Sequence, residues 1–419
     1  MHKKSIIIIG GGIAGLVAAA ELSSRFEVIL LEALPVFGGR IMTLNESGFA
    51  QPIEGGAEFV HGAAEETLRL LQKAKVGYSK VEGAFYRLQQ NGGLKKEEGQ
   101  VEGWDMLMEK MSEATPDTSL QQFLDHHFRG DRFQLLRGQA ITFAEGFDLA
   151  DINTVSVKSL YKEWSHQSED HRVDGGYKRL IDYLADDCLK KGCKLILDEQ
   201  VKDIRWSEGN VQLFTQDSFK YEADKCLITV PLGVLQNTGG SMALNFFPPI
   251  TSYLSALRKI GFGTVVKIIL SFKECFWEKD AGFFFSEEEI PTWWTQLPSD
   301  VPILTGWAGG PKGATWSACT DEQLLEIALI SLAGIFDKTI PELKEMLSAY
   351  HIFNWMQRGT SSGAYSYATT DSTASVLTYL NTPINDTIYF AGEGLYEGLH
   401  PGTVEAAIVN SLAVAKRIN

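Results

Sequence analysis

A glycine-rich segment near the N-terminus has the residue types and spacing of a phosphate-binding turn. Gly10, Gly12 and Gly15 form a Gly-x-Gly-x-x-Gly pattern directly after the apolar run Ile6–Ile9. The first glycine permits a tight turn, the second lets backbone approach a pyrophosphate, and the third lets a helix pack closely with its N-terminus toward the phosphates. Glu32 ends the next apolar run, at the spacing at which a carboxylate accepts hydrogen bonds from a ribose hydroxyl. These residues predict a dinucleotide-binding unit.

The residues after this unit indicate which dinucleotide is bound, because NAD and FAD both use such a turn. Glu32-Ala33 is followed by Gly38-Gly39-Arg40. Two glycines beside an arginine can bring backbone N–H groups and a guanidinium against a second phosphate, which a simple nicotinamide dehydrogenase rarely needs at this place. The pattern favours FAD.

The phrase Glu-Ala-x-x-x-x-Gly-Gly-Arg resembles that of the glutathione-reductase-like FAD proteins, and specifically that of the flavin-containing amine oxidases. Four more segments extend the resemblance along the chain: 51–62, 200–204, 224–231 and 388–407. The resemblance implies non-covalent FAD held at both chain ends. The cofactor-binding residues implied are Gly10, Gly12, Ile13, Ala14, Gly15, Glu32, Ala33, Gly38, Gly39, Arg40, Gly56, Ala57, Glu58, Val201, Trp355, Gly392, Glu393, Thr403 and Val404.

Lys267 stands at the centre of an apolar β-strand pattern, 264–272. From periodicity alone, Lys267 would lie on the solvent face of a half-exposed strand. The resemblance implies a different position, because amine oxidases carry a lysine in Lys-Ile-x-Leu-x-Phe that holds a water molecule against flavin N5. A buried lysine near reduced flavin would favour oxygen reduction electrostatically. We therefore expect Lys267 to be catalytic.

Three further residues correspond to positions near the flavin in this family. Tyr365 matches an aromatic residue that flanks the amine nitrogen, and we expect it to be catalytic. Its usual aromatic partner on the substrate side is replaced by Thr403, so the resemblance implies that Thr403 contacts substrate and that the two-sided aromatic cage is incomplete. Ala364 occupies the position of the cysteine that tethers FAD in monoamine oxidases, and this predicts a dissociable cofactor.

One histidine and two carboxylates are candidates for contact with substrate. His61 is either a core histidine or a polar group that overlooks the substrate, and the resemblance to polyamine-type members favours the second interpretation. Glu145 resembles a glutamate that faces the amine tunnel, and Glu58 is a second candidate. Both carboxylates could equally be solvated surface groups.

The reaction implied is FAD-dependent oxidation of a small amine, most simply a polyamine. A hydride passes from the α-carbon to flavin N5, and water and O2 then give an aldehyde, a shorter amine and hydrogen peroxide. An L-amino-acid oxidase is an alternative that needs an arginine for the substrate carboxylate, with Arg69 and Arg358 as possibilities. A flavin-binding regulatory protein without turnover is an alternative of another class.

The elements that must position these residues predict an α/β fold of two interleaved domains. A glutathione-reductase-like Rossmann FAD-binding domain would comprise residues 1–79, 196–250 and 384–419. An α+β substrate domain with a mixed or antiparallel sheet would comprise residues 80–195 and 251–383. The 419 residues are too many for one small domain, and the composition is that of a packed globular protein.

Charge and cysteine content limit the partners and the compartment. The 38 basic and 53 acidic residues leave a net charge of −15, which disfavours nucleic acid as a partner. The five cysteines do not form a disulfide framework, no metal-ligand spacing is present, and we expect no metal. Residues 3–20 imitate a secretory signal, but cleavage there would remove the glycine turn. We expect a cytoplasmic monomer or homodimer without membrane contact, acting on a small amine and O2.

Overall fold

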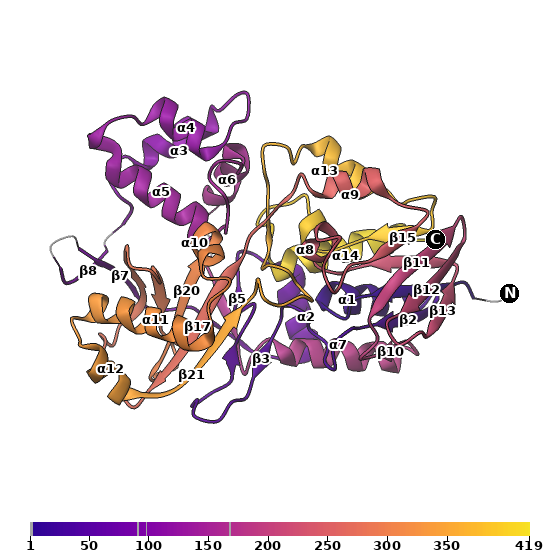
Figure 1. Cartoon of the computed structure of the whole chain (residues 1–419), viewed down its shortest axis with the longest axis horizontal. Coiled ribbons are helices and arrows are strands. Elements are labelled where there is room, and N and C mark those ends of the chain that lie inside the picture. Colours follow the sequence, from indigo (N-terminus) through magenta and orange to yellow (C-terminus); the bar gives the residue numbers. More distant parts are fainter. Residues whose placement is uncertain (1–2, 90–91, 98, 167–168) are drawn as a thin grey trace.

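A five-stranded parallel sheet organises the part of the chain that contains the glycine turn. The structure is a computed structural model that describes residues 3–89, 92–97, 99–166 and 169–419 (Figure 1). The strands of this sheet, in spatial order, are β10 (Lys194–Ile196), β2 (Glu27–Leu31), β1 (Ser5–Ile9), β14 (Lys225–Ile228) and β23 (Ile388–Phe390). First and last segments of the chain therefore share one sheet.

Strand β1 is buried on both faces, as its apolar run predicts. Ile6 and Ile8 belong to one hydrophobic core, whereas Ile7 and Ile9 belong to another on the opposite face. The helices of the first core are α1 (Ile13–Leu22), α2 (Glu65–Ala74), α7 (Lys178–Lys190) and α14 (Val404–Arg417). The elements on the second face are strands β13 (Lys220–Ala223), β12 (Asn210–Thr215), β11 (Val201–Ser207) and β15 (Asn245–Phe247) with helices α8 (Leu232–Gln236), α9 (Thr251–Leu257) and α13 (Ala374–Leu380).

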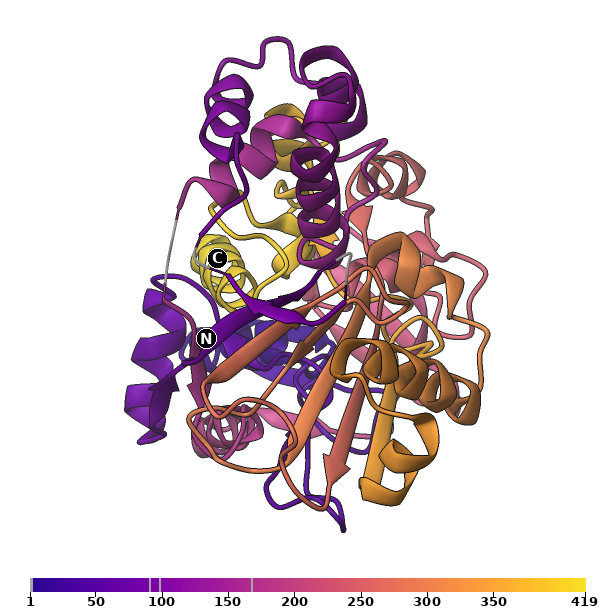
Figure 2. The same cartoon turned by 90° about the vertical axis from the view of Figure 1, so that its left-hand side faces the viewer.

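A seven-stranded mixed sheet forms the second half of the molecule. Its strands, in spatial order, are β21 (Leu347–Asn354), β17 (Val265–Phe272), β20 (Ile303–Gly309), β19 (Thr292–Trp294), β18 (Ala281–Phe285), β7 (Ala84–Leu88) and β8 (Leu94–Lys96). Among the described residues of this sheet, β18 and β7 pair in parallel and the other neighbouring strands pair antiparallel. Helices α11 (Asp321–Phe336) and α12 (Ile340–Met346) cover its outer face, as Figure 2 shows in orange, and α10 (Gly310–Thr315) follows β20.

A helical unit stands above the space between the two sheets (Figures 1 and 2). It consists of α3 (Trp104–Ser112), α4 (Leu120–His127), α5 (Gln134–Gly146) and α6 (Val157–Trp164), with a 3-10 turn, η1, at Asp131–Phe133. These helices share a core of their own. The helical unit therefore forms one wall of the space between the two sheets.

Short strands connect these larger parts. The small sheets are β5 (Phe59–Val60) with β9 (His171–Val173) and β6 (Tyr78–Lys80), β3 (Thr43–Leu44) with β4 (Ile53–Glu54), and β16 (Gly261–Phe262) with β22 (Ser366–Tyr367). A second 3-10 turn, η2, spans Glu393–Leu395.

The structure agrees with the predicted α/β fold of interleaved parts, but one predicted boundary divides a packed unit. Helix α7 packs against α1, and β10 pairs with β2, so residues 178–195, which were predicted in the substrate domain, pack with the parallel sheet. The reason is that the helix and strand complete the first core, which periodicity alone did not reveal. The remaining predicted boundaries stay a prediction. No helix in the described part of the chain is long and apolar enough to cross a membrane.

Candidate active site

A cavity of about 1160 Å³ runs between the two sheets and beneath the helical unit. Its lining comes from the turn after β1, the end of β2, the centre of β17, helices α5 and α6, and the segment that leads into α14. One space therefore joins the predicted phosphate-binding turn to the predicted catalytic residues.

The glycine turn has the shape that a bound phosphate requires. Gly10 adopts a positive φ of 108°, which favours glycine, and Gly12 precedes α1 without any side chain that caps the helix. The first N–H groups of α1 are thus free of a side-chain cap at the edge of the cavity. A Cβ on Gly15 would lie 2.0 Å from the carbonyl oxygen of Gly10, so Gly15 serves helix packing and does not line the cavity.

Glu32 and Arg40, which were predicted to bind ribose and phosphate, form hydrogen bonds to groups of the protein itself. Glu32 accepts hydrogen bonds from the backbone N–H of Gly11 at 2.6 Å and of Leu34 at 2.9 Å, while its burial raises its pKa. Arg40 donates through Nη1 to Glu393 Oε1 and to the carbonyl of Ala364, both at 2.7 Å. Arg40 therefore joins the two chain ends at the cavity.

Lys267 lies on the inner face of β17, and the solvent-face alternative is wrong. The side chains of Val266 and Ile268 point into the core beneath α11, so Lys267 points to the cavity, where it is only 1% exposed. Its Nζ donates to Glu58 Oε2 at 2.7 Å and to the carbonyl of Gly56 at 3.2 Å. A buried ammonium is thus balanced by a buried carboxylate.

Glu58 is the centre of a charge cluster that the sequence did not predict in full. Its Oε1 accepts from Trp294 Nε1 at 2.9 Å and from Arg172 Nε at 3.2 Å. Burial opposes ionisation, but the charges of Lys267 and Arg172 and the hydrogen bonds hold the pKa of Glu58 below its ordinary value. Glu58 is an ionised partner of Lys267, not a solvated surface group.

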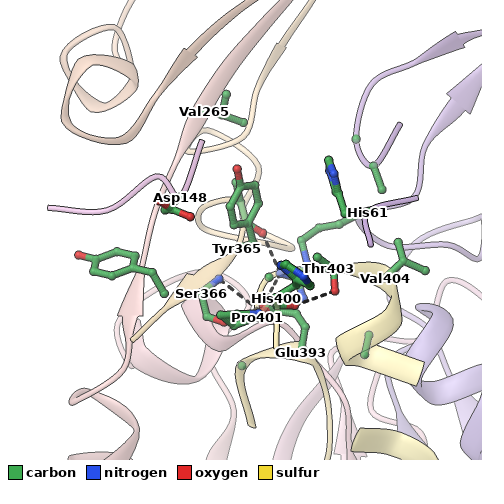
Figure 3. A pocket seen from close by; sticks show the side chains of 18 of the residues that line it. His61, Asp148, Val265, Tyr365, Ser366, Glu393, His400, Pro401, Thr403 and Val404 are labelled. Atoms are coloured by element: carbon green, nitrogen blue, oxygen red, sulfur yellow. Dashed lines mark hydrogen bonds and ion pairs between the residues drawn. The ribbon is translucent and has the colours of Figure 1, made fainter. Parts of the chain in front are cut away.

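Tyr365 and His61 face one chamber of the cavity (Figure 3). Tyr365 donates its hydroxyl hydrogen to the carbonyl of Phe147 at 2.5 Å, and burial raises its pKa well above the ordinary value. His61 Nδ1 lies 3.1 Å from Asp170 Oδ1. Although burial favours the neutral imidazole, the hydrogen bond and charge of Asp170 raise the pKa of His61.

Two acids and a second histidine complete this chamber, and motif reasoning missed all three. Asp148 is 6% exposed and accepts from Trp164 Nε1 at 3.0 Å. Glu163 Oε1 lies 3.8 Å from His400 Nδ1. All of these residues line the cavity. The one local feature of the sequence that could have pointed to them is that Asp148 stands three residues after Glu145, which was predicted to face the substrate.

Glu145, Thr403 and Trp355 occupy different places relative to the cavity. Glu145 is half-buried but is not among the lining residues, so the structure does not bring it to the chamber. Thr403 lines the cavity and caps α14, because its Oγ1 accepts from Ala406 N at 3.1 Å. Trp355 also lines the cavity and donates to the carbonyl of Gly55 at 2.9 Å.

A continuous series of rings runs from His61 toward the outside of the molecule. Neighbouring ring centroids are 5.8 Å apart for His61 and Phe59, 6.2 Å for Phe59 and Phe283, 5.3 Å for Phe283 and Phe85, and 6.0 Å for Phe85 and Phe285. All five rings line the cavity, and Phe85 is 48% exposed. We call these five residues the aromatic track.

The geometry is that of a flavin enzyme site, and comparison with known proteins gives the family. The model of the family described as flavin containing amine oxidoreductase matches residues 13–419, so the chain belongs to this family. It is a flavin-dependent amine oxidoreductase. The predicted resemblance is confirmed.

Individual relatives are similar at moderate identity. The chain is 26% identical to polyamine oxidase 4 of Oryza sativa subsp. japonica, over 98% of this chain and 88% of that protein. It is 27% identical to lysine-specific histone demethylase 2 of Homo sapiens, over 100% of this chain but only 53% of that protein.

Solved structures confirm the fold class. Putrescine oxidase bound to putrescine matches with a TM-score of 0.83 at 19% identity, over 99% of this chain and 98% of that one. Cyclohexylamine oxidase from Brevibacterium oxydans IH-35A matches with a TM-score of 0.83 at 18% identity, over 100% and 99%.

FAD is the cofactor of this family, and the residues present fit it. Of the residues predicted to bind FAD, all except Gly15 line the cavity. A Cβ built on Gly392 would meet no atom within 4 Å, and Gly392 has a φ of 145°, so the second glycine segment also borders open space. The described residues contain no group of three or more His, Cys, Asp or Glu that could hold a metal ion.

Proposed function

We propose that this enzyme oxidises an elongated polyamine, with O2 as the electron acceptor, to an aldehyde, a shorter amine and hydrogen peroxide. The bound FAD supplies the acceptor for a hydride from the α-carbon of the amine. The chain's own residues bind the cationic substrate, orient its reacting nitrogen and place a positive charge where oxygen is reduced.

The observation that carries the proposal is the acidic lining of the chamber beside Tyr365. Asp148, Glu163 and Asp170 all line it, together with His61. Carboxylates in a confined space attract cations and raise their local concentration. Two similar proteins, polyamine oxidase 4 and putrescine oxidase, are named for polyamine or diamine substrates, which supports the same substrate class for this enzyme.

The aromatic track supports a long substrate rather than a compact one. The faces of aromatic rings attract ammonium groups, and their surfaces cover methylene chains. A polyamine offers both groups in alternation. One end of such a molecule would reach Tyr365 and His61 while the other end lies on Phe283 and Phe85.

Lys267 has the surroundings that the proposed role requires. Two of its three N–H hydrogens are directed to Glu58 and Gly56, which leaves a third for a water molecule in the cavity. Because Lys267 is buried, the attraction between its positive charge and the negative charge that develops on oxygen is screened less than it would be in water. Tyr365 and His61 shape the chamber on the substrate side.

The two alternatives have less support. Neither Arg69 nor Arg358 lines the cavity. The arginines that line it in the described part of the chain are Arg40, paired with Glu393, and Arg87, paired with Glu97, so neither is free for the carboxylate of an L-amino acid. A regulatory protein without turnover would have no use for a buried Lys267 and a partly buried Tyr365 in one cavity.

The experiment is a substrate panel on the purified holoenzyme. Spermine, spermidine, acetylated polyamines, monoamines and amino acids are supplied in turn, and peroxide release and anaerobic bleaching of the flavin are recorded. Bleaching by polyamines above all other compounds supports the proposal. Bleaching only by monoamines or only by amino acids contradicts it.

A further inference from the structure

If the enzyme oxidises an amine, as proposed above, one proton of the substrate must be removed before the oxidation. The group that takes this proton is identified below, and that inference rests on the proposed function. An alkylamine has a pKa near that of lysine, about 10.4, and therefore arrives as an ammonium ion at neutral pH. The α-carbon gives up a hydride only when the nitrogen is neutral. Something in the site must therefore take the ammonium proton before the hydride moves.

The chamber contains a pair of carboxyl groups suited to this task. Asp148 is buried and its Oδ2 is held by Trp164 Nε1, which fixes the carboxyl at the chamber wall. Glu163, on the same helix as Trp164, carries a side chain that is 13% exposed and acts electrostatically on Asp148. Figure 3 shows Asp148 beside Tyr365 in the chamber that His61 and His400 also line.

Asp148 is buried, Glu163 is largely shielded from solvent, and the two carboxyl groups repel each other electrostatically, so they do not both ionise readily. Burial raises the pKa of Asp148 well above its ordinary value, and the negative charge of Glu163 raises it further. Their protonation belongs to the pair rather than to either residue. The carboxyl group of Asp148 therefore binds a proton more readily than an ordinary aspartate does, at the wall that faces the substrate.

We propose that the Asp148–Glu163 pair accepts the proton of the substrate ammonium inside the enzyme–substrate complex. An N–H bond of the ammonium breaks, its electron pair stays on nitrogen, and the proton bonds to a carboxylate oxygen of the pair. No electron is transferred in this step. Because a neutral amine beside a neutral acid is easier to bury than two ions, the desolvated chamber favours the transfer.

The other titratable groups around the pair are consistent with this role. Tyr365 faces Asp148, and its pKa is raised, so the phenol stays protonated. His61 feels the charge of Glu163 but is paired with Asp170. His400 Nδ1 lies 3.8 Å from Glu163 Oε1 and its side chain is 21% exposed, which gives the proton a route to solvent after turnover.

The test is the pH dependence of anaerobic flavin reduction in the holoenzyme at saturating spermidine. The wild type is expected to change by less than about threefold between pH 6.5 and 9, because the proton moves within the complex. The double variant Asp148→Asn/Glu163→Gln has no acceptor, so its rate should fall about tenfold for each pH unit below the pKa of the amine. Each single variant should lie between these limits, because the remaining carboxyl takes over.

Controls separate this inference from the proposed function and from misfolding. Glu145→Gln removes a nearby carboxyl with a raised pKa that does not line the cavity, and its profile should match the wild type. If the double variant loses bound flavin, the pH profiles of the two single variants test the proposal in its place. A variant profile as flat as the wild type overturns the proton-acceptor role alone. A wild type whose flavin no amine bleaches at any pH overturns the proposed function, and the inference with it.

Discussion

Lys267 Nζ and Glu58 Oε2 lie 2.7 Å apart and join strand β17 to the loop that precedes β5. Glu58 is the buried partner of Lys267, and the charges of Lys267 and Arg172 with the hydrogen bond from Trp294 hold the pKa of Glu58 below its ordinary value. Lys267 and Arg172 share this one carboxylate, so the three groups together keep a net positive charge beside the cavity, which favours the reduction of oxygen.

Lys267→Met should slow reoxidation of the reduced enzyme by at least about tenfold while FAD stays bound, because the positive charge is lost and the side-chain volume is kept. Stopped-flow mixing of the reduced enzyme with O2 measures this rate. Lys225→Met is the matched control, since Lys225 is also buried and donates to the carbonyl of Asp386 at 2.7 Å, outside the cavity. Equal oxygen reactivity of the two variants would refute the role of Lys267.

Glu54 should make the fold less stable as the pH rises. Burial raises its pKa from 4.5 to about 7, although the N–H of Tyr177 and the hydroxyl of Thr43 donate to it. The folded chain therefore holds this proton more tightly than the unfolded chain does. The contribution to the unfolding free energy is fully present below pH 4.5 and falls by about 1.4 kcal/mol per pH unit until about pH 7.

Glu54→Gln removes this titration and keeps an acceptor for Tyr177. The free energy of unfolding is measured with urea on both holoenzymes at several values between pH 4.5 and 8. Between the two ends of this range, the value for the variant should rise by about 3 kcal/mol relative to that of the wild type. Parallel stability curves for the two proteins would mean that Glu54 titrates normally.

Local motifs pointed to residues on the cofactor side, and all of these except Gly15 line the cavity. Gly10, Gly12 and Gly392 serve backbone requirements that a short segment expresses by itself, namely positive φ or close approach of a ligand. The apolar run of β1 likewise predicted a strand buried on both faces. Such features depend on neighbours in sequence, so one sequence suffices to find them.

The substrate half depends on contacts between distant segments, and there prediction was weaker. Glu58 and Arg172 meet only through the pairing of β5 with β9, which no local pattern expresses. Glu145, by contrast, was predicted to face the substrate but does not line the cavity. Phe143 in α5 lines the cavity, and two residues further along a helix of 3.6 residues per turn the side chain points to the other side.

FAD should leave the protein when the fold is destroyed. Ala364 occupies the position where a cysteine would tether the flavin, and it is buried at the cavity with its carbonyl bound to Arg40. Precipitation with acid followed by centrifugation should leave all yellow colour in the supernatant. Flavin fluorescence on the washed polypeptide would show a covalent link and contradict this expectation.

The aromatic track should select for substrate length. Phe85→Ala removes a ring that is 48% exposed, so the fold should tolerate the change, but the outer part of a long amine loses its contact. Loss of one ring contact worth about 1 kcal/mol would raise KM roughly fivefold for spermine, with kcat little changed. KM for a short monoamine that ends near Tyr365 should stay the same. Phe219→Ala, which removes an exposed ring away from the cavity, is the control. If Phe85→Ala weakens short and long amines equally, the track does not contact the distal part of the substrate and serves only the shape of the chamber.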